Sequence, residues 1–259
     1  KLTYRDMPDP FAGAGQSLIR VEASGICGSD MHAFLGHDER RPSPLILGHE
    51  AAGTIVGGPR DGTRVTINPL VTCGKCRACK AGRDNLCPER MIISMPPREG
   101  AFAEMVVMRD ENLVTVPDDV PLRKAALAEP LACGWHAVRL GAAALSLHLK
   151  DAACHVIGGG AIGVGAALAL RAFGATKITV AEPNALRRAT LDQIDGFDAV
   201  DGRLLEFELA RVTAECRALR AGHAHAVDAH RGVLGVEAAD TDRAGVGVVV
   251  IDHHAGKVL

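Results

Sequence analysis

The sequence is poor in aromatic residues, in net charge and in uninterrupted apolar runs. Aromatic side chains make up 3% of the 259 residues, and 29 basic against 31 acidic residues leave a net charge of −2. A nucleic-acid-binding protein needs aromatic stacking platforms and a basic surface for phosphates. Because both are lacking, we expect neither a nucleic acid nor an anionic lipid surface as the partner.

One segment approaches the length of a membrane span. Residues 152–175 carry no charged side chain before Arg171, and a span needs about 20 apolar residues. Five of the first fourteen are glycine, however, in a spacing that a nucleotide-binding turn explains better. No charged-then-apolar signal peptide is visible either. We therefore expect a protein of the reducing cytoplasm, without a membrane partner.

Hydrophobic residues make up 47% of the chain, which is enough for one large core or two modest ones. The first 120 residues contain short β-like runs ended by glycine or proline. The runs are 17–27, 50–58, 64–73, 101–108 and 112–117. Residues 122–147 are instead rich in alanine and leucine, which is typical of helices. This change of composition predicts two domains, 1–145 and 146–259.

Strands and helices alternate in the second domain. The pattern predicts strands over 154–159 and 177–182 and helices over 161–174 and 184–194, with very short connections. Further on, apolar residues at helical spacing predict a helix over 205–219, and residues 245–252 resemble a buried strand. The fold class is therefore α/β, with a doubly wound parallel sheet in the second domain.

Three glycines follow the first of these strands in the pattern G-x-G-x-x-G, namely Gly158, Gly160 and Gly163. The pattern alone is a weak signal. Here a strand precedes it, a helix follows it, and Glu182 ends the next strand 19 residues after Gly163. Such glycines allow a tight turn and let a pyrophosphate approach the backbone. The segment therefore predicts a dinucleotide site, although a glycine-rich turn without a ligand stays open.

The residues around this turn favour NAD over NADP. Ala161 and Ile162, at the start of the helix, offer N–H groups that can hold phosphate. Glu182 is expected to accept hydrogen bonds from the adenosine ribose, and its charge disfavours a 2′-phosphate. Arg187 and Arg188 lie close enough in sequence to weaken that preference.

Four of the eight cysteines lie within fifteen residues: Cys73, Cys76, Cys79 and Cys87. Their spacing, C-x2-C-x2-C-x7-C, suits one tetrahedral zinc whose four positions are all filled by protein. No position is left for substrate and no cysteine is left to act as an attacking thiol. The predicted role is therefore structural. The four basic residues between the cysteines are interpreted as counter-charge for the zinc–thiolate centre, a solvated basic loop being the alternative.

Cys27, His49 and Glu50 lie in two short motifs of the first domain, GICGSDMH and GHEAAG. A thiolate, an imidazole and a carboxylate are a plausible ligand set for a zinc with an open position. Residue types alone make this case weak, since a lone cysteine is usually a core residue and a lone histidine usually structural.

These motifs, the cysteine cluster, the segment EPLACGWHAV and the dinucleotide turn follow one another in a familiar order. Over residues 1 to about 200 the chain resembles zinc-containing medium-chain alcohol and polyol dehydrogenases, most closely the sorbitol, threonine and butanediol branch. The resemblance implies a GroES-like, mostly β catalytic domain over 1–145 with a zinc lobe at 73–87. It also implies a Rossmann NAD-binding domain over 146–259, either incomplete or with its last strand, AGKVL, returning to the catalytic domain.

The resemblance also implies the ligands of a catalytic zinc. Cys27 and His49 match two of them, and Glu50 is a third ligand or an exchanging carboxylate beside the metal. Glu129, in AEPLA, matches the glutamate that ligates the metal or holds its water in this branch. Cys133, one helical turn later, is the rival of Glu129 and is interpreted as a core cysteine.

The activity that the resemblance implies is hydride transfer from a secondary alcohol or polyol to NAD, with zinc as the Lewis acid on the substrate hydroxyl. Ser29 and His32 match the family's proton relay to solvent, although His32 could equally be a surface histidine. Two zinc ions per chain, a small-molecule substrate and a homodimer or homotetramer are expected. A non-catalytic member of the same fold, a redox sensor or a structural protein, is the alternative.

Overall fold

The structure of the chain is a computed structural model, and it describes residues 2–145, 149–201, 227–228, 233–234 and 248–252. The chain separates into two compact units, one ending at Glu129 and the other beginning at Pro130. The predicted domain boundary at residues 145–146 lies at the end of helix α4 (Ala128–Leu145), whereas the two units divide near the start of that helix, so the boundary stays a prediction. Pro130 lies in the first turn of that helix, where a missing N–H is tolerated.

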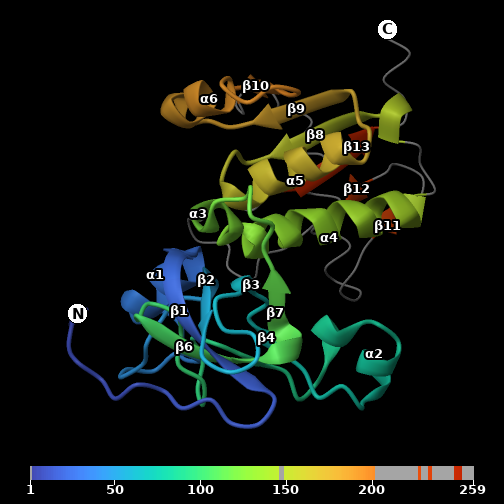
Figure 1. Cartoon of the computed structure of the whole chain (residues 1–259). Coiled ribbons are helices and arrows are strands. Elements are labelled where there is room, and N and C mark those ends of the chain that lie inside the picture. Colours follow the sequence, from blue (N-terminus) through green and yellow to red (C-terminus); the bar gives the residue numbers. More distant parts are fainter. Residues whose placement is uncertain (1, 146–148, 202–226, 229–232, 235–247, 253–259) are drawn as a thin grey trace, which may run out of the picture. The chain divides into compact units, whose positions relative to one another are not determined.

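A five-stranded antiparallel sheet forms the centre of the first unit, in the order β6-β1-β2-β3-β7 (Figure 1). Its strands are β1 (Gln16–Gly25), β2 (Glu50–Val56), β3 (Arg64–Ile67), β6 (Met105–Arg109) and β7 (Leu113–Thr115). Ile19, Ile55, Val65 and Met108 bury their side chains in one core. The mostly β first domain that the glycine-bounded runs predict is therefore confirmed.

Short elements complete this unit. They are α1 (Gly28–Phe34), β4 (Leu70–Val71), α2 (Arg77–Lys80), η1 (Asp84–Leu86), β5 (Met91–Ile92), η2 (Asp110–Asn112) and α3 (Leu122–Ala125). The single run predicted over 64–73 is divided into β3 and β4 at Pro69, which has no N–H for a ladder. β4 pairs with β5 in a separate two-stranded sheet beside the cysteine cluster.

The second unit contains a six-stranded sheet in the order β10-β9-β8-β13-β12-β11. β8 (Ala153–Ile157), β9 (Lys177–Ala181) and β10 (Asp198–Val200) are parallel, as the alternating pattern predicts. β13 (Val248–Asp252) instead pairs antiparallel with β8 and with β12 (Val233–Leu234), which pairs with β11 (Val227–Asp228). The sheet is therefore mixed and not wholly parallel as predicted. Antiparallel neighbours can be joined without the helical crossover that parallel strands need. The α/β class is confirmed.

Two helices and a short turn accompany the parallel strands: α5 (Ala161–Ala172), α6 (Ala185–Leu191) and η3 (Leu149–Asp151). α5 packs on β8 and β9 (Figure 1). Val156, Leu170 and Val180 are fully buried in the core between them, together with Val138 of α4. The helix predicted over 205–219 and the closing AGKVL lie outside the described residues. Among the helices that the structure does describe, none has the length and apolarity to cross a bilayer.

Candidate metal and nucleotide sites

Two groups of side chains in the described part of the chain could each hold a metal ion. One consists of Cys27, His49 and Glu50, and the other of the four cysteines between residues 73 and 87. Within each group, the candidate ligand atoms all lie within 4.8 Å of one another. The structure therefore brings together three of the four residues expected at the catalytic zinc and all four expected at the structural zinc.

The first group is assembled where strands β1 and β2 lie side by side. Gly25, the last residue of β1, is opposite Glu50, the first residue of β2. Cys27 follows as the N-cap of α1, and His49 directly precedes β2. A Cβ atom at Gly25 would overlap the Glu50 carboxylate and lie 3.2 Å from its Cβ. Because glycine has no Cβ atom, the Glu50 carboxylate can lie near the Cys27 thiol.

A further residue, the buried Asp30, joins the segments that carry these side chains. One carboxylate oxygen accepts the N–H of Cys27 (3.0 Å) and the other accepts the N–H of Gly48 (3.1 Å). The second oxygen also lies 3.5 Å from Nδ1 of His49, a buried ring nitrogen that has no other hydrogen-bond partner. Asp30 was not among the predicted site residues. Its place three residues after the N-cap, where an acidic side chain can close a capping box, is the signal that could have identified it.

Burial and the neighbouring polar groups shift the pKa values of Cys27 and His49 in opposite directions. Burial alone would raise the pKa of Cys27, but hydrogen bonds from His49 and Ser29 outweigh it and lower that pKa. Burial alone would lower the pKa of His49, but Asp30 and Cys27 raise it to about 10. These interactions favour the charged forms of both Cys27 and His49. This arrangement fits a cation site, since zinc takes the place of the proton between such ligands.

The two carboxylates of this region remain protonated more readily than in water. Burial raises the pKa of both Glu50 and Glu129. Glu129 lies near enough for the charges of His49, Glu50 and Asp30 to act on it, but its carboxylate is not within the group of atoms that could share one ion. The fourth ligand therefore stays a prediction.

The structure differs from expectation at Cys133. This thiol, interpreted as a core cysteine, is exposed on α4. The helix turns Gly134, Ala137 and Val138 inward, and Cys133 lies outside that stripe.

The predicted proton relay has two members on α1. Ser29 lies close enough to Cys27 for its hydroxyl and its backbone N–H to lower the pKa of that thiol. His32 lies one turn further along, with its ring centroid 6.3 Å from that of His37. The two residues share a helix with the ligand Cys27 at its start, and their role as a relay stays a prediction.

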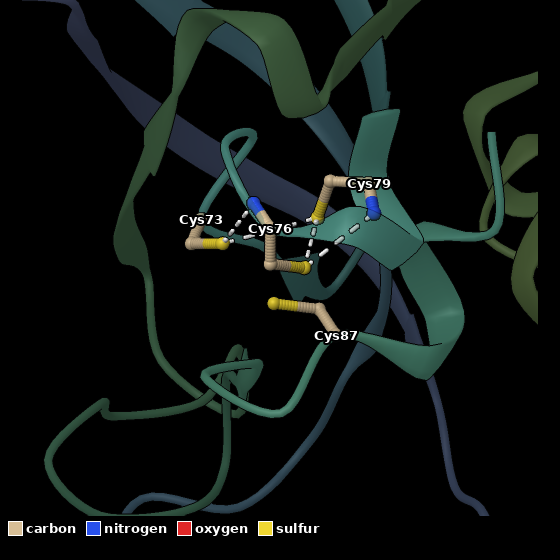
Figure 2. Close-up of side chains that lie close together, drawn as sticks. All are labelled: Cys73, Cys76, Cys79 and Cys87. Atoms are coloured by element: carbon tan, nitrogen blue, oxygen red, sulfur yellow. Dashed lines mark hydrogen bonds between the residues drawn. The ribbon is translucent and has the colours of Figure 1, made fainter. Parts of the chain in front are cut away.

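Figure 2 shows the four cysteines of the second group converging from the loop that contains α2 and η1. The sulfur of Cys76 lies 3.5 Å from that of Cys79, and the sulfurs of Cys73 and Cys79 are 4.0 Å apart. Such separations are typical of thiolates around one tetrahedral ion, whose bonds to sulfur are about 2.3 Å long. Backbone N–H groups of Lys75 and Cys76 lower the pKa of Cys73 to about 7. The donors thus fit a closed zinc site.

The glycine-rich turn connects β8 to α5 as predicted. Gly158 has φ of 95°, which favours glycine, and Gly160 is the N-cap of α5. The first hydrogen bond of the helix runs from Val164 to the Gly160 carbonyl (2.9 Å), so the preceding N–H groups of Ala161 and Ile162 have no intrahelical acceptor. A Cβ atom at Gly163 would overlap the carbonyl oxygen of Gly158. The turn can therefore present unpaired N–H groups to phosphate.

Glu182 lies directly after β9 and is buried, with 2% of its surface exposed. Its carboxylate accepts the N–H of Gly159 (2.9 Å) and that of Asn184 (2.8 Å), and Arg187 approaches it to 3.6 Å. A carboxylate has about four acceptor sites, so two remain for further donors. Arg188 donates instead to the Glu182 carbonyl (2.7 Å). The Glu182 carboxylate is thus hydrogen bonded to the glycine-rich turn, which is the position expected of a residue that binds the adenosine ribose.

Comparison with known proteins identifies relatives for most of the described chain. Residues 13–118 match the family model of the alcohol dehydrogenase GroES-like domain. A sorbitol dehydrogenase of Bacillus subtilis is 40% identical over 196 residues, which are 72% of this chain and 54% of that protein. An L-threonine 3-dehydrogenase of Sinorhizobium medicae is 37% identical over 190 residues, 70% of this chain and 53% of that protein. The chain spans about half the length of these curated relatives.

Solved structures show the same fold. An Escherichia coli oxidoreductase/dehydrogenase of unknown specificity superposes with a TM-score of 0.71 and 31% identity, covering 82% of this chain and 63% of that one. A candidate zinc-binding dehydrogenase of Sinorhizobium meliloti, bound to NADP, has a TM-score of 0.68 and 32% identity, covering 77% and 58%.

Proposed function

The chain belongs to the zinc-containing medium-chain alcohol and polyol dehydrogenases, and from this premise we propose that it oxidises a secondary alcohol or polyol to the ketone with NAD as hydride acceptor. The observation that carries the proposal is the group of the half-buried Cys27 and the buried His49 and Glu50, whose ligand atoms lie within 4.8 Å of one another. A non-catalytic member of the fold would have no need to retain this set in addition to a nucleotide turn.

A catalytic zinc in this group would be held by the Cys27 thiolate and by the Nε2 atom of His49, because Nδ1 of that ring faces Asp30. Glu50 supplies a third donor, and Glu129, whose pKa its neighbours influence, is the proposed fourth ligand or water-holding group. When bound, the zinc supplies a Lewis acid that lowers the pKa of a substrate hydroxyl. Asp30 holds the imidazole in the tautomer and orientation that such a ligand requires.

The remaining residues of the site move the proton and exclude water. The Ser29 hydroxyl, which is close enough to Cys27 to lower the pKa of that thiol, would accept a proton leaving the substrate, and His32 would pass it to solvent. His49 and Glu50 are buried, with 6% of each exposed. Burial strengthens the electrostatic interactions that these groups make with a reacting alcohol.

The cofactor in this proposal is NAD, bound through its pyrophosphate at the turn of Gly158, Gly160 and Gly163. Glu182 would bind the adenosine ribose, with Arg187 as the nearest cation. A relative with this fold is bound to NADP, so the fold alone does not exclude that cofactor. NAD is favoured here because a 2′-phosphate would have to approach the Glu182 carboxylate.

We further propose a second, structural zinc at Cys73, Cys76, Cys79 and Cys87, a homodimer or homotetramer, and a cytoplasmic location. All seven described cysteines are free thiols, and a reducing compartment keeps such ligands available for metal.

The proposal is tested by an NADH absorbance assay of the zinc-loaded chain with a panel of secondary alcohols and polyols. Turnover with at least one of them, lost in Cys27→Ser, is expected. NADP⁺ replaces NAD⁺ in a parallel series and should give a lower kcat/KM. Zinc-loaded protein that binds NADH but oxidises none of the alcohols would favour the non-catalytic alternative.

A further inference from the structure

A series of buried polar contacts leads from Asp30 to Arg41, which the proposed mechanism does not use. Arg41 is 8% exposed, and its guanidinium makes two bonds in different directions. Nε donates to the backbone carbonyl of Ser94 (2.9 Å), and Nη1 donates to the carboxylate of Asp38 (2.6 Å). A buried guanidinium is costly unless its donors are satisfied. The two acceptors therefore hold this side chain in one orientation.

Ser94 is the residue that Arg41 holds, and its backbone conformation is unusual. It is fully buried and has φ of 68°, in the left-handed region that glycine adopts more easily. Its hydroxyl lies 3.5 Å from the Oδ1 atom of Asp30, a long contact inside the protein. Ser94 thus accepts a hydrogen bond from Arg41 with its backbone carbonyl and contacts Asp30 with its side-chain hydroxyl. Fixing the carbonyl of Ser94 therefore helps to direct its hydroxyl toward Asp30.

Three donors meet at Oδ1 of Asp30. They are the N–H of Gly48 (3.1 Å), the hydroxyl of Ser94 (3.5 Å) and Nδ1 of His49 (3.5 Å). Two of these contacts are long, so small movements of the carboxylate decide how well His49 is held. If the hydroxyl of Ser94 is lost or turned away, the carboxylate loses the one side-chain hydroxyl that faces the same oxygen as His49.

From this arrangement we propose that Arg41 and Ser94 are positioning residues for His49, which they orient by fixing the Asp30 carboxylate against its Nδ1 atom. The inference rests on the proposed catalytic zinc. Groups that orient a metal-binding histidine typically contribute about 10- to 100-fold in metal affinity. Arg41 acts at a distance through Ser94 and Asp30, so the lower end of that range is expected.

The test uses the full chain with cadmium in place of zinc, observed by cadmium NMR and by competition with a chelator. Four thiolates and a mixed set of thiolate, nitrogen and oxygen give separate cadmium signals, so the four-cysteine site is an internal reference. Arg41→Met and Ser94→Gly should weaken cadmium binding at the mixed site by about tenfold and shift or broaden its signal alone. Ser94→Gly removes the hydroxyl together with its Cβ atom and suits the positive φ, so it remains informative if Arg41→Met fails to fold.

Arg40→Met is the matched control. Arg40 binds the same Asp38 carboxylate (2.8 Å) from an exposed position, and its loss should leave the mixed site unchanged. Cadmium affinity within about twofold of wild type and an unmoved mixed-site signal in both Arg41→Met and Ser94→Gly would overturn the inference while leaving the proposed function intact. A wild-type spectrum without a mixed-site signal would overturn the proposed catalytic metal and the inference with it.

Discussion

Replacing Gly163 by alanine is expected to damage the nucleotide turn, whereas the same change two residues later, at Gly165, is expected to be harmless. A Cβ atom at Gly163 would overlap the carbonyl oxygen of Gly158, lie 2.9 Å from its carbonyl carbon and stand 3.4 Å from a methyl of Val156. Because the obstructing atoms are mostly backbone, α5 must move away from β8 to admit the methyl group.

The size of the effect follows from two opposing contributions. Forcing an extra carbon into a packed site costs about 1–3 kcal/mol. Alanine gains about 0.5–1 kcal/mol over glycine inside a helix. The net loss at Gly163 is therefore about 1–2 kcal/mol, or roughly a 5- to 30-fold lower ratio of folded to unfolded protein. At Gly165 the nearest atom, the Pro130 carbonyl oxygen, lies at an ordinary 3.4 Å, so only the gain of about 0.5–1 kcal/mol applies.

Urea denaturation followed by circular dichroism measures both variants, and NADH fluorescence measures cofactor binding. Gly163→Ala should unfold at lower urea and bind NADH at least about tenfold more weakly, because the N-terminus of α5 holds the phosphates. Gly165→Ala should bind NADH as the wild type does. Equal stability losses in the two variants, or a Gly163→Ala protein with wild-type NADH affinity, would refute this reasoning about the turn.

Three further substitutions test other parts of the structure. Arg40 lowers the pKa of Asp38 to about 2, so the ionised Asp38 carboxylate stabilises the fold above pH about 4, and this stabilisation is lost as the pH falls through about 2. The Asp38→Asn variant should therefore be less stable than wild type by at most about 2 kcal/mol at neutral pH. Thermal unfolding should show that this difference is absent near pH about 2. Gly25→Ala, whose methyl would overlap Glu50, should weaken cadmium at the mixed site in chelator competition and leave the four-cysteine site filled. Cys87→Ser, at a fully buried position, should lower both the zinc content and the Tm, and an unchanged Tm would argue against a structural role.

Much of the fold follows from local patterns in the sequence. Glycine-bounded β runs predict the strands of the first unit, and the alternation around the G-x-G-x-x-G turn predicts β8, α5 and β9. Helix α1 was not predicted, because it has seven residues and its N-cap is Cys27, a residue type that is not a usual N-cap. The antiparallel direction of β13 was also missed, since a buried apolar run carries no information about the direction of its neighbour.

Some residues of the candidate site were predicted from the sequence and others were not. Cys27, His49 and Glu50 were predicted from their motifs, and the structure brings their ligand atoms together. Asp30 was missed because helix α1, whose capping box it closes, was not predicted, and because its partners Gly48 and His49 lie 18 or more residues away in sequence. Contacts of that kind depend on how β1 and β2 pair, which a local pattern does not contain.

The central claim is that Cys27 belongs to a zinc site where hydride transfer takes place, and zinc content measured alongside NADH formation tests it most directly. The wild-type chain should contain two zinc ions and form NADH from an alcohol of the panel. Cys27→Ser should retain the zinc of the four-cysteine cluster, still bind NADH and form none from the alcohol. A Cys27→Ser protein with its full zinc content and wild-type turnover would contradict the account.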